Sequence, residues 1–263
     1  MPEGQHRRSQ TSRPLFGARA THHRAAGNAM EDGWTGRLHR HKYLLLLLIL
    51  ICALIVQSVD RHLVAATVIA ELLVGISLFV MILVVFEGRR GRFAAIGSGV
   101  LVIALGWVRY LFPDAAHAWM DILEKSLLMV FHGWAAALIL RDVFHQERIR
   151  TDDVLGAVSG YLLAGGAWEN LYALCAILIP GSFNISPDLA AQFGDANAGG
   201  GLFLYFSLAT LTSVGYGDIT PLRGPVTAFA MLETVFGQFY IAVVVAQIVG
   251  MHMAQGPRGR GGE

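Results

Sequence analysis

A run of small and polar residues, Thr-Leu-Thr-Ser-Val-Gly-Tyr-Gly-Asp at 210–218, follows a short apolar stretch that begins at Leu202. As a helix, residues 202–212 would be about 16 Å long, roughly half the thickness of the hydrocarbon core of a bilayer. Backbone that leaves a helix at membrane depth is tolerated only inside protein or along a water-filled path. A half-span followed by a Gly-x-Gly strand therefore predicts a pore.

The run resembles the signature of the potassium channel family, whose members are tetrameric pore-loop cation channels. The residues that stand in the family order are Thr212, Val214, Gly215, Tyr216, Gly217 and Asp218. The surrounding order of helix, outer loop, half-helix, strand and helix fits the family as well. The resemblance covers about residues 154–252 and much less of 43–150.

The resemblance implies a K⁺ selectivity filter, in which backbone carbonyl groups replace the water around a dehydrated ion. The filter residues would be Ser213, Val214, Gly215, Tyr216 and Gly217, with a further oxygen from the Ser213 hydroxyl. Consecutive carbonyl groups can face one way only if alternate residues take unusual dihedral angles, which the two glycines permit. The residues expected to support the filter are Thr212, Asp218 and Tyr205, the last by a hydrogen bond to Tyr216.

Two positions depart from the family pattern. Ser213 stands where the family usually has Thr, so the hydroxyl is kept and a methyl group is lost. Tyr205 and Phe206 stand where many relatives carry Trp, and Phe206 cannot donate a hydrogen bond to Tyr216. A weakly selective channel for monovalent cations therefore stays open as an alternative.

The composition shows what must position this segment. Of the 263 residues, 54% are hydrophobic and 15% are charged, against about 25% charged in soluble domains, and the mean hydropathy is +0.52. Such a chain predicts an integral membrane protein. The apolar runs cover residues 43–56, 63–86, 93–111, 122–144, 154–179 and 225–251.

The expected fold is that of an all-α membrane protein. It has six transmembrane helices, with a re-entrant pore helix and selectivity filter between the fifth and the sixth. Residues 127–140 of the fourth run contain no Arg or Lys, and Lys125 and Arg141 only flank them, which disfavours a voltage sensor. The expected parts are a disordered cytoplasmic tail (1–42), a four-helix bundle (43–150), the pore module (151–253) and a short cytoplasmic tail (254–263).

The positions of the cations predict the topology. Cytoplasmic loops carry an excess of Arg and Lys, and alternate connections of this chain hold most of them. The cations assigned to the cytoplasm are Arg37, Arg40, Lys42, Arg89, Arg90, Arg92, Arg141, Arg148, Arg150, Arg258 and Arg260. We therefore expect a multi-pass protein of the plasma (inner) membrane with both termini in the cytoplasm.

The last apolar run carries the candidate gating residues. Gly237 falls where related channels bend the inner helix, so it is a candidate hinge, although close packing is the alternative for a small residue. Gln238 and Ile241 are expected to line the inner cavity. Val245 and Val249 are candidates for an apolar constriction that gates by losing water.

Ionisable residues inside the apolar runs are the remaining candidates. They are Glu71, Arg109, Glu169 and Glu233, together with His132, for which a packing role is expected. Such residues are functional candidates by default, and here they are either structural braces or sensors of a proton or ligand. Glu71 and Arg109 are expected to pair, whereas Glu169 and Glu233 flank the half-helix in sequence. An alternative of a different class is a secondary transporter that uses Glu71 and Arg109.

The expected partners follow from the filter. One strand supplies a quarter of a ring around an axial ion, so four copies with cyclic symmetry are implied. We expect membrane lipid and K⁺ as further partners, and no nucleic acid. The sequence shows no paired nucleophile, zinc-ligand spacing or phosphate loop, so neither an enzyme nor a cofactor is expected.

Overall fold

The computed structural model of the chain describes residues 42–57, 64–85, 89–112, 118–145, 151–193 and 201–254. The two predicted tails lie outside these ranges, apart from Lys42 and Ala254. The side chains of Glu71 and Arg109 also lie outside the described part, so their predicted pairing stays a prediction.

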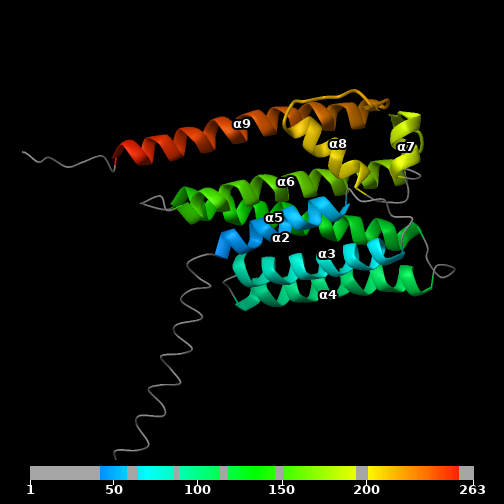
Figure 1. Cartoon of the computed structure of the whole chain (residues 1–263), viewed down its shortest axis with the longest axis horizontal. Coiled ribbons are helices and arrows are strands. Elements are labelled where there is room, and N and C mark those ends of the chain that lie inside the picture. The colour runs from blue at the N-terminus through cyan, green and yellow to red at the C-terminus, as the bar shows by residue number, and fades with distance from the viewer. Residues whose placement is uncertain are drawn as a thin grey trace, which may run out of the picture. The chain divides into compact units, whose positions relative to one another are not determined.

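Each apolar run forms a helix (Figure 1). The six helices are α2 (Lys42–Gln57), α3 (Val64–Val85), α4 (Arg89–Leu111), α5 (Ala118–His145), α6 (Thr151–Leu178) and α9 (Gly224–Ala254). By length and composition, α5, α6 and residues 224–247 of α9 can cross a membrane. The described chain is therefore mostly helical and fits an all-α membrane protein, while the count of six spans stays a prediction.

Two shorter helices and a pair of strands lie between α6 and α9. They are β1 (Phe183–Ile185), α7 (Pro187–Phe193), α8 (Leu202–Leu211) and β2 (Ile219–Pro221). The two strands are antiparallel, and Asn184 is opposite Thr220. This pairing ties the connection after α6 to the chain just before α9.

The central helix is α6, which contacts α2, α5, α8 and α9. Small residues let helices approach closely where lipid removes the usual hydrophobic drive for association. Four glycines of α6 each face a side chain from a different helix: Tyr43 of α2 at Gly156, Tyr240 of α9 at Gly160, Leu208 of α8 at Gly165 and His132 of α5 at Gly166. Since these neighbours come from both predicted domains, 43–150 and 151–253 share one core around α6.

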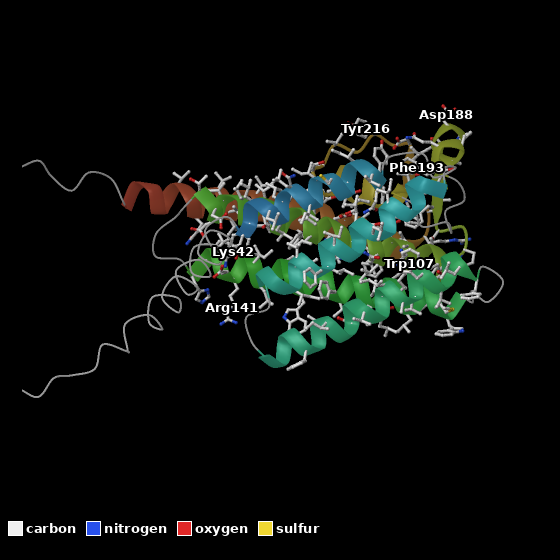
Figure 2. The ribbon with its side chains drawn as sticks, turned by 60° about the horizontal axis from the view of Figure 1, so that its bottom comes forward. Lys42, Trp107, Arg141, Asp188, Phe193 and Tyr216 are labelled. Atoms are coloured by element: carbon white, nitrogen blue, oxygen red, sulfur yellow. The ribbon has the colours of Figure 1, made fainter. Side chains whose placement is uncertain are left out.

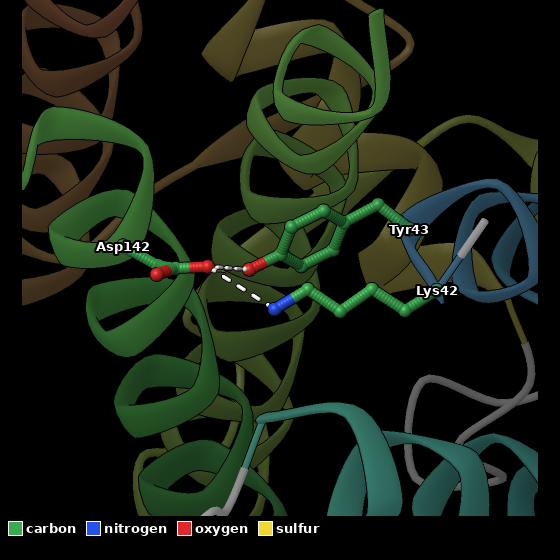
Figure 3. A network of polar contacts seen from close by, with 3 residues as sticks. All are labelled: Lys42, Tyr43 and Asp142. Atoms are coloured by element: carbon green, nitrogen blue, oxygen red, sulfur yellow. Dashed lines mark hydrogen bonds and ion pairs between the residues drawn. The ribbon is translucent and has the colours of Figure 1, made fainter. Parts of the chain in front are cut away.

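A polar cluster joins the start of α2 to the end of α5 (Figure 3). Lys42 Nζ donates to Asp142 Oδ2 at 3.3 Å, and the Tyr43 hydroxyl donates to the same oxygen. The Tyr43 ring is buried, and a Cβ atom at Gly156 would lie 2.9 Å from it. The cluster therefore fixes α2 against both α5 and α6.

Different labelled residues lie at the two ends of the helices (Figure 2). Tyr216 lies toward the same end as Asp188 and Phe193 of α7, whereas Lys42 and Arg141 lie toward the other end. The 210–218 run is thus opposite to the end that the cation distribution assigns to the cytoplasm.

Candidate functional site

The helix α8 ends where the glycine-containing run begins. It covers Leu202–Leu211, and Thr212 follows as its C-cap with φ −86° and ψ −2°. The Thr212 N–H donates to Leu208 O at 3.0 Å, and its hydroxyl donates to the same oxygen at 2.6 Å. The predicted short helix over 202–212 is therefore present, and the chain leaves helical geometry directly after it.

The next residues alternate in backbone conformation. Ser213, Gly215 and Gly217 have positive φ angles of 58°, 56° and 82°. Glycine adopts such angles at no steric cost, as predicted for the two glycines. Ser213 is the only non-glycine residue with positive φ in the described part of the chain, and this was not expected because serine rarely adopts that region. Positive φ therefore recurs at every second residue of the 213–217 segment.

The backbone N–H groups at the start of this segment point back to α8. The Ser213 N–H donates to Thr210 O at 2.9 Å, and the N–H groups of Val214 and Gly215 donate to Ala209 O at 2.9 and 3.3 Å. Within the described residues, no hydrogen bond reaches a backbone carbonyl of the 213–217 segment. The first three N–H groups of the segment are therefore bound by α8, while its carbonyl groups accept no hydrogen bond from the described residues.

Two aromatic residues and Asp218 hold the outer end of the segment. The Tyr205 ring stacks on Tyr216 with centroids 6.0 Å apart and planes 8° apart. The Tyr205 hydroxyl donates to Asp218 Oδ2 at 2.5 Å, so the expected hydrogen bond to Tyr216 is wrong. The ring stacking directs the hydroxyl past Tyr216 to the carboxylate beyond it.

Asp218 connects the segment to the strand pair. Its second carboxylate oxygen accepts a hydrogen bond from the Ile219 N–H at 3.0 Å, and its backbone carbonyl accepts one from the Ser186 N–H at 2.8 Å. Asp218 therefore fixes the outer end to α8 and to the chain after β1.

The inner end of the segment meets α9. Gln238 Nε2 donates to Ser213 Oγ at 2.9 Å, which brings together a predicted cavity residue and a predicted filter residue. Next to it, a Cβ atom at Gly237 would lie 2.0 Å from the Leu211 carbonyl oxygen. The same oxygen accepts a hydrogen bond from the Tyr161 hydroxyl at 2.9 Å.

Gly237 thus has a packing role, because no larger residue fits against the end of α8. The helix α9 runs through this position as one element from Gly224 to Ala254. The hinge role of Gly237 stays a prediction. The remaining predicted cavity and gate residues, Ile241, Val245 and Val249, are exposed on α9 in the single chain.

Behind α8 lies a buried polar cluster centred on Glu233 of α9, whose exposed fraction is 0%. The Tyr172 hydroxyl of α6 donates to Glu233 Oε2 at 2.6 Å. Ser207 Oγ of α8 lies 2.5 Å from Glu233 Oε1 and 2.9 Å from Gly165 O of α6. The cluster joins α6, α8 and α9 with four residues.

Sequence reasoning named Glu233 but missed its partners. It noted only that Glu233 flanks the half-helix in sequence, whereas Glu233 meets the Ser207 side chain within α8. The sequence feature that could have indicated these partners is the presence of two hydroxyl side chains, Ser207 and Tyr172, within apolar helices. Glu169, the other carboxyl group considered there, is half-buried on α6.

Residues 174–253 match a protein family described as an ion channel. The match begins within α6 and continues through α8, the 213–217 segment and α9, so it includes the segment and its contacts on α8 and α9 but not Tyr161, Gly165 and Tyr172 of α6. It supports a membrane protein that conducts ions passively, and ion channel families are not families of enzymes. Searches of the curated proteins and of the solved structures found no match.

Proposed function

We propose that this protein is the subunit of a K⁺-selective channel, in which four copies form one pore for passive K⁺ conduction across the plasma membrane. The observation that carries the proposal is the hydrogen bonding of the 213–217 segment. Its first N–H groups are bound by α8, while its carbonyl groups accept no hydrogen bond from the described residues. Oxygen atoms left in that state are available to a cation.

The chemistry of these oxygens supports K⁺ as the ion. A monovalent cation that sheds its water needs several oxygen atoms of moderate field strength, and backbone carbonyl groups supply them. The alternating φ angles at Ser213, Gly215 and Gly217 allow neighbouring carbonyl groups to line one side of the strand. The order of residues in this segment is also that of the potassium channel signature.

The single chain leaves the surfaces exposed that a tetramer would cover. Val214 and Tyr216 are 52% and 70% exposed although both are apolar or aromatic. On α9, Glu233, Gly237, Tyr240 and Val244 are buried, while Met231, Leu232, Val235, Phe239, Val243 and Val245 are exposed. One face of α9 therefore packs on its own subunit, and the others are available to neighbouring copies, to the cavity and to lipid.

The proposed conduction path continues along α9. Along α9, this path begins at Gln238, which donates a hydrogen bond to Ser213. Ile241, Val245 and Val249 follow at helical spacings of three and four residues, so they share a face with Gln238. An apolar ring of four valines at either of the last two positions is a candidate gate that closes by dewetting.

The test is ⁸⁶Rb⁺ uptake by liposomes that contain the purified protein, with and without Ba²⁺. We expect a Ba²⁺-sensitive flux that external K⁺ competes with far better than Na⁺. A flux without preference for K⁺ over Na⁺ would instead support the weakly selective alternative. The absence of any Ba²⁺-sensitive flux would contradict the proposal.

The variant Gly215→Ala tests the role of the 213–217 segment, and Gly97→Ala is its matched control. A Cβ atom at Gly215 meets nothing within 4 Å, so the strain comes from the φ angle of 56° rather than from a clash. We expect a selective flux reduced to background with assembly unchanged. Gly97→Ala adds the same atom in open space on α4, where φ is ordinary, and should conduct as the unmodified protein does.

A further inference from the structure

The buried cluster of Glu233, Ser207, Tyr172 and Gly165 has no place in the conduction path proposed above. It is buried between α6, α8 and α9, whereas the 213–217 segment is exposed. Its three oxygen–oxygen contacts are 2.5, 2.6 and 2.9 Å long. Each distance requires a hydrogen atom between the two oxygens.

The number of hydrogen atoms available to the three contacts determines whether the Glu233 carboxyl group is ionised or neutral. Ser207 and Tyr172 each supply one hydroxyl hydrogen, and the Gly165 carbonyl supplies none. An ionised Glu233 also supplies none, which leaves two hydrogens for three contacts. A neutral Glu233 supplies the third: its O–H donates to Ser207 Oγ, Ser207 donates to Gly165 O, and Tyr172 donates to Glu233 Oε2.

The surroundings favour the same state. Among the described residues, no Lys, Arg or His side chain forms an ion pair with Glu233. A fully buried carboxylate without a counter-charge is costly, whereas a neutral carboxyl group with two hydrogen bonds is not. The titratable groups that face it are Tyr172 and Tyr161, both on α6, while α8 presents the Ser207 hydroxyl.

The position of the cluster indicates what the proton does. Ser207 is in the middle of α8, and the last turn of α8 receives the N–H groups of the 213–217 segment. The shared hydrogen bonds hold α8 to α6 through Gly165 and to α9 through Glu233. Any shift of α8 would be passed to the segment through Ala209 and Thr210.

We propose that Glu233 is a positioning residue that works in its neutral form, and that its proton holds the helix behind the 213–217 segment in place. Removal of that proton at alkaline pH breaks one contact and leaves a buried charge, which moves α8 and reduces conduction. The link to conduction rests on the proposed function, whereas the neutral state of Glu233 does not.

The direct test is infrared spectroscopy of the full-length protein in liposomes at neutral pH. A neutral carboxyl group has a C=O band that is separate from the carboxylate band and shifts in D₂O. We expect such a band in the unmodified protein and its loss in Glu233→Gln. Identical spectra in this region for the two proteins would overturn the proposal, whether or not the protein conducts ions.

The functional test compares Glu233→Gln with Glu233→Ala in the ⁸⁶Rb⁺ assay. The amide of Gln can donate to Ser207 and accept from Tyr172, so this variant should keep its flux and lose the alkaline decline of the unmodified protein. Glu233→Ala removes both hydrogen bonds, and we expect at least about a tenfold loss of flux. A Gln variant as inactive as the Ala variant, or with the same pH profile as the unmodified protein, would overturn the positioning role.

Melting temperatures provide a third measurement, which tests the neutral state of Glu233 separately from the proposed channel function. If no variant conducts, the proposed function fails, while the infrared band and the melting temperatures still test the state of Glu233. We then expect Glu233→Gln to melt close to the unmodified protein and Glu233→Ala to melt lower, because Tyr172 and Ser207 lose their buried partner. Equal destabilisation by the two substitutions would contradict a neutral, hydrogen-bonded Glu233.

Discussion

At the scale of single residues, Tyr205 makes two different contacts with the outer end of the 213–217 segment. Its ring stacks on Tyr216, and its hydroxyl donates to Asp218, two residues farther along the chain. Stacking alone would let the outer end of the segment slide across the ring. The hydrogen bond to a carboxylate fixes the position, because its geometry is directional and its acceptor is charged.

The variant Tyr205→Phe separates the two contributions. It keeps the ring against Tyr216 and removes the donor to Asp218, so we expect a loss of about 1.5 kcal/mol in the free energy of unfolding. We also expect the ⁸⁶Rb⁺ flux to show a weaker preference for K⁺ over Na⁺. Tyr205→Leu removes the ring as well and should cost more. Equal stability of Tyr205→Phe and the unmodified protein would show that the hydroxyl contributes nothing.

At the scale of elements, α9 determines where α8 can end. Gly237 lies against the Leu211 carbonyl, and Tyr161 of α6 donates to the same oxygen. The end of α8 is therefore enclosed between two helices. A glycine at this position is required by space, whatever bending α9 undergoes.

The variant Gly237→Ala tests this packing role. Its Cβ atom would lie 2.0 Å from a backbone oxygen, so α8 or α9 must shift, at a cost of about 1–3 kcal/mol or more. We expect a lower melting temperature together with a loss of flux. Gly250→Ala, on the same helix with nothing within 4 Å, should melt at the same temperature or higher. Normal stability of Gly237→Ala with altered gating alone would favour a hinge instead.

The contact of α2 with α5 is a second element-scale feature. Both the Tyr43 hydroxyl and Lys42 donate to Asp142. We expect a double-mutant cycle with Tyr43→Phe and Asp142→Asn to give a coupling energy of about 1 kcal/mol in unfolding measurements. The Phe ring still packs on Gly156, so the cycle reports the polar contact. Additive effects of the two substitutions would show that this contact does not couple the helices.

At the scale of the whole molecule, the proposed pore needs more than one chain. Its 213–217 segment is exposed, and so is the face of α9 that carries Ile241 and Val245. A ring of carbonyl groups around one axis needs equivalent strands at equal distances, which cyclic symmetry provides. With one such strand per chain, the proposed function implies a ring of four chains.

Native mass spectrometry of the purified protein checks this directly. The chain has a mass of 28.5 kDa, and we expect assemblies of four chains without smaller stable species. Gly215→Ala should give the same assembly, because the strain at that residue is local to the 213–217 segment. A stable dimer or monomer as the conducting species would contradict the tetramer.

Some features of the site could be predicted because they depend on local chemistry. The end of α8 at Thr212 follows from where the apolar stretch gives way to small polar residues, and the φ angles of Gly215 and Gly217 follow from the residue type. The positive φ of Ser213 could not be predicted, since nothing in a serine demands it. The partners of Glu233 and Tyr205 could not be predicted either, because they depend on how the helices pack.

The sequence by itself determined the helices, the half-length of α8 and the segment in which carbonyl groups can align. Only the tertiary structure decided that Glu233 meets Tyr172, 61 residues away, and that Gly237 covers the end of α8. The physical reason is that lipid-facing and packed surfaces of such helices are both apolar, so hydropathy does not fix their rotation or register. Small and polar residues fix them instead, through contacts that exist only after the helices have packed.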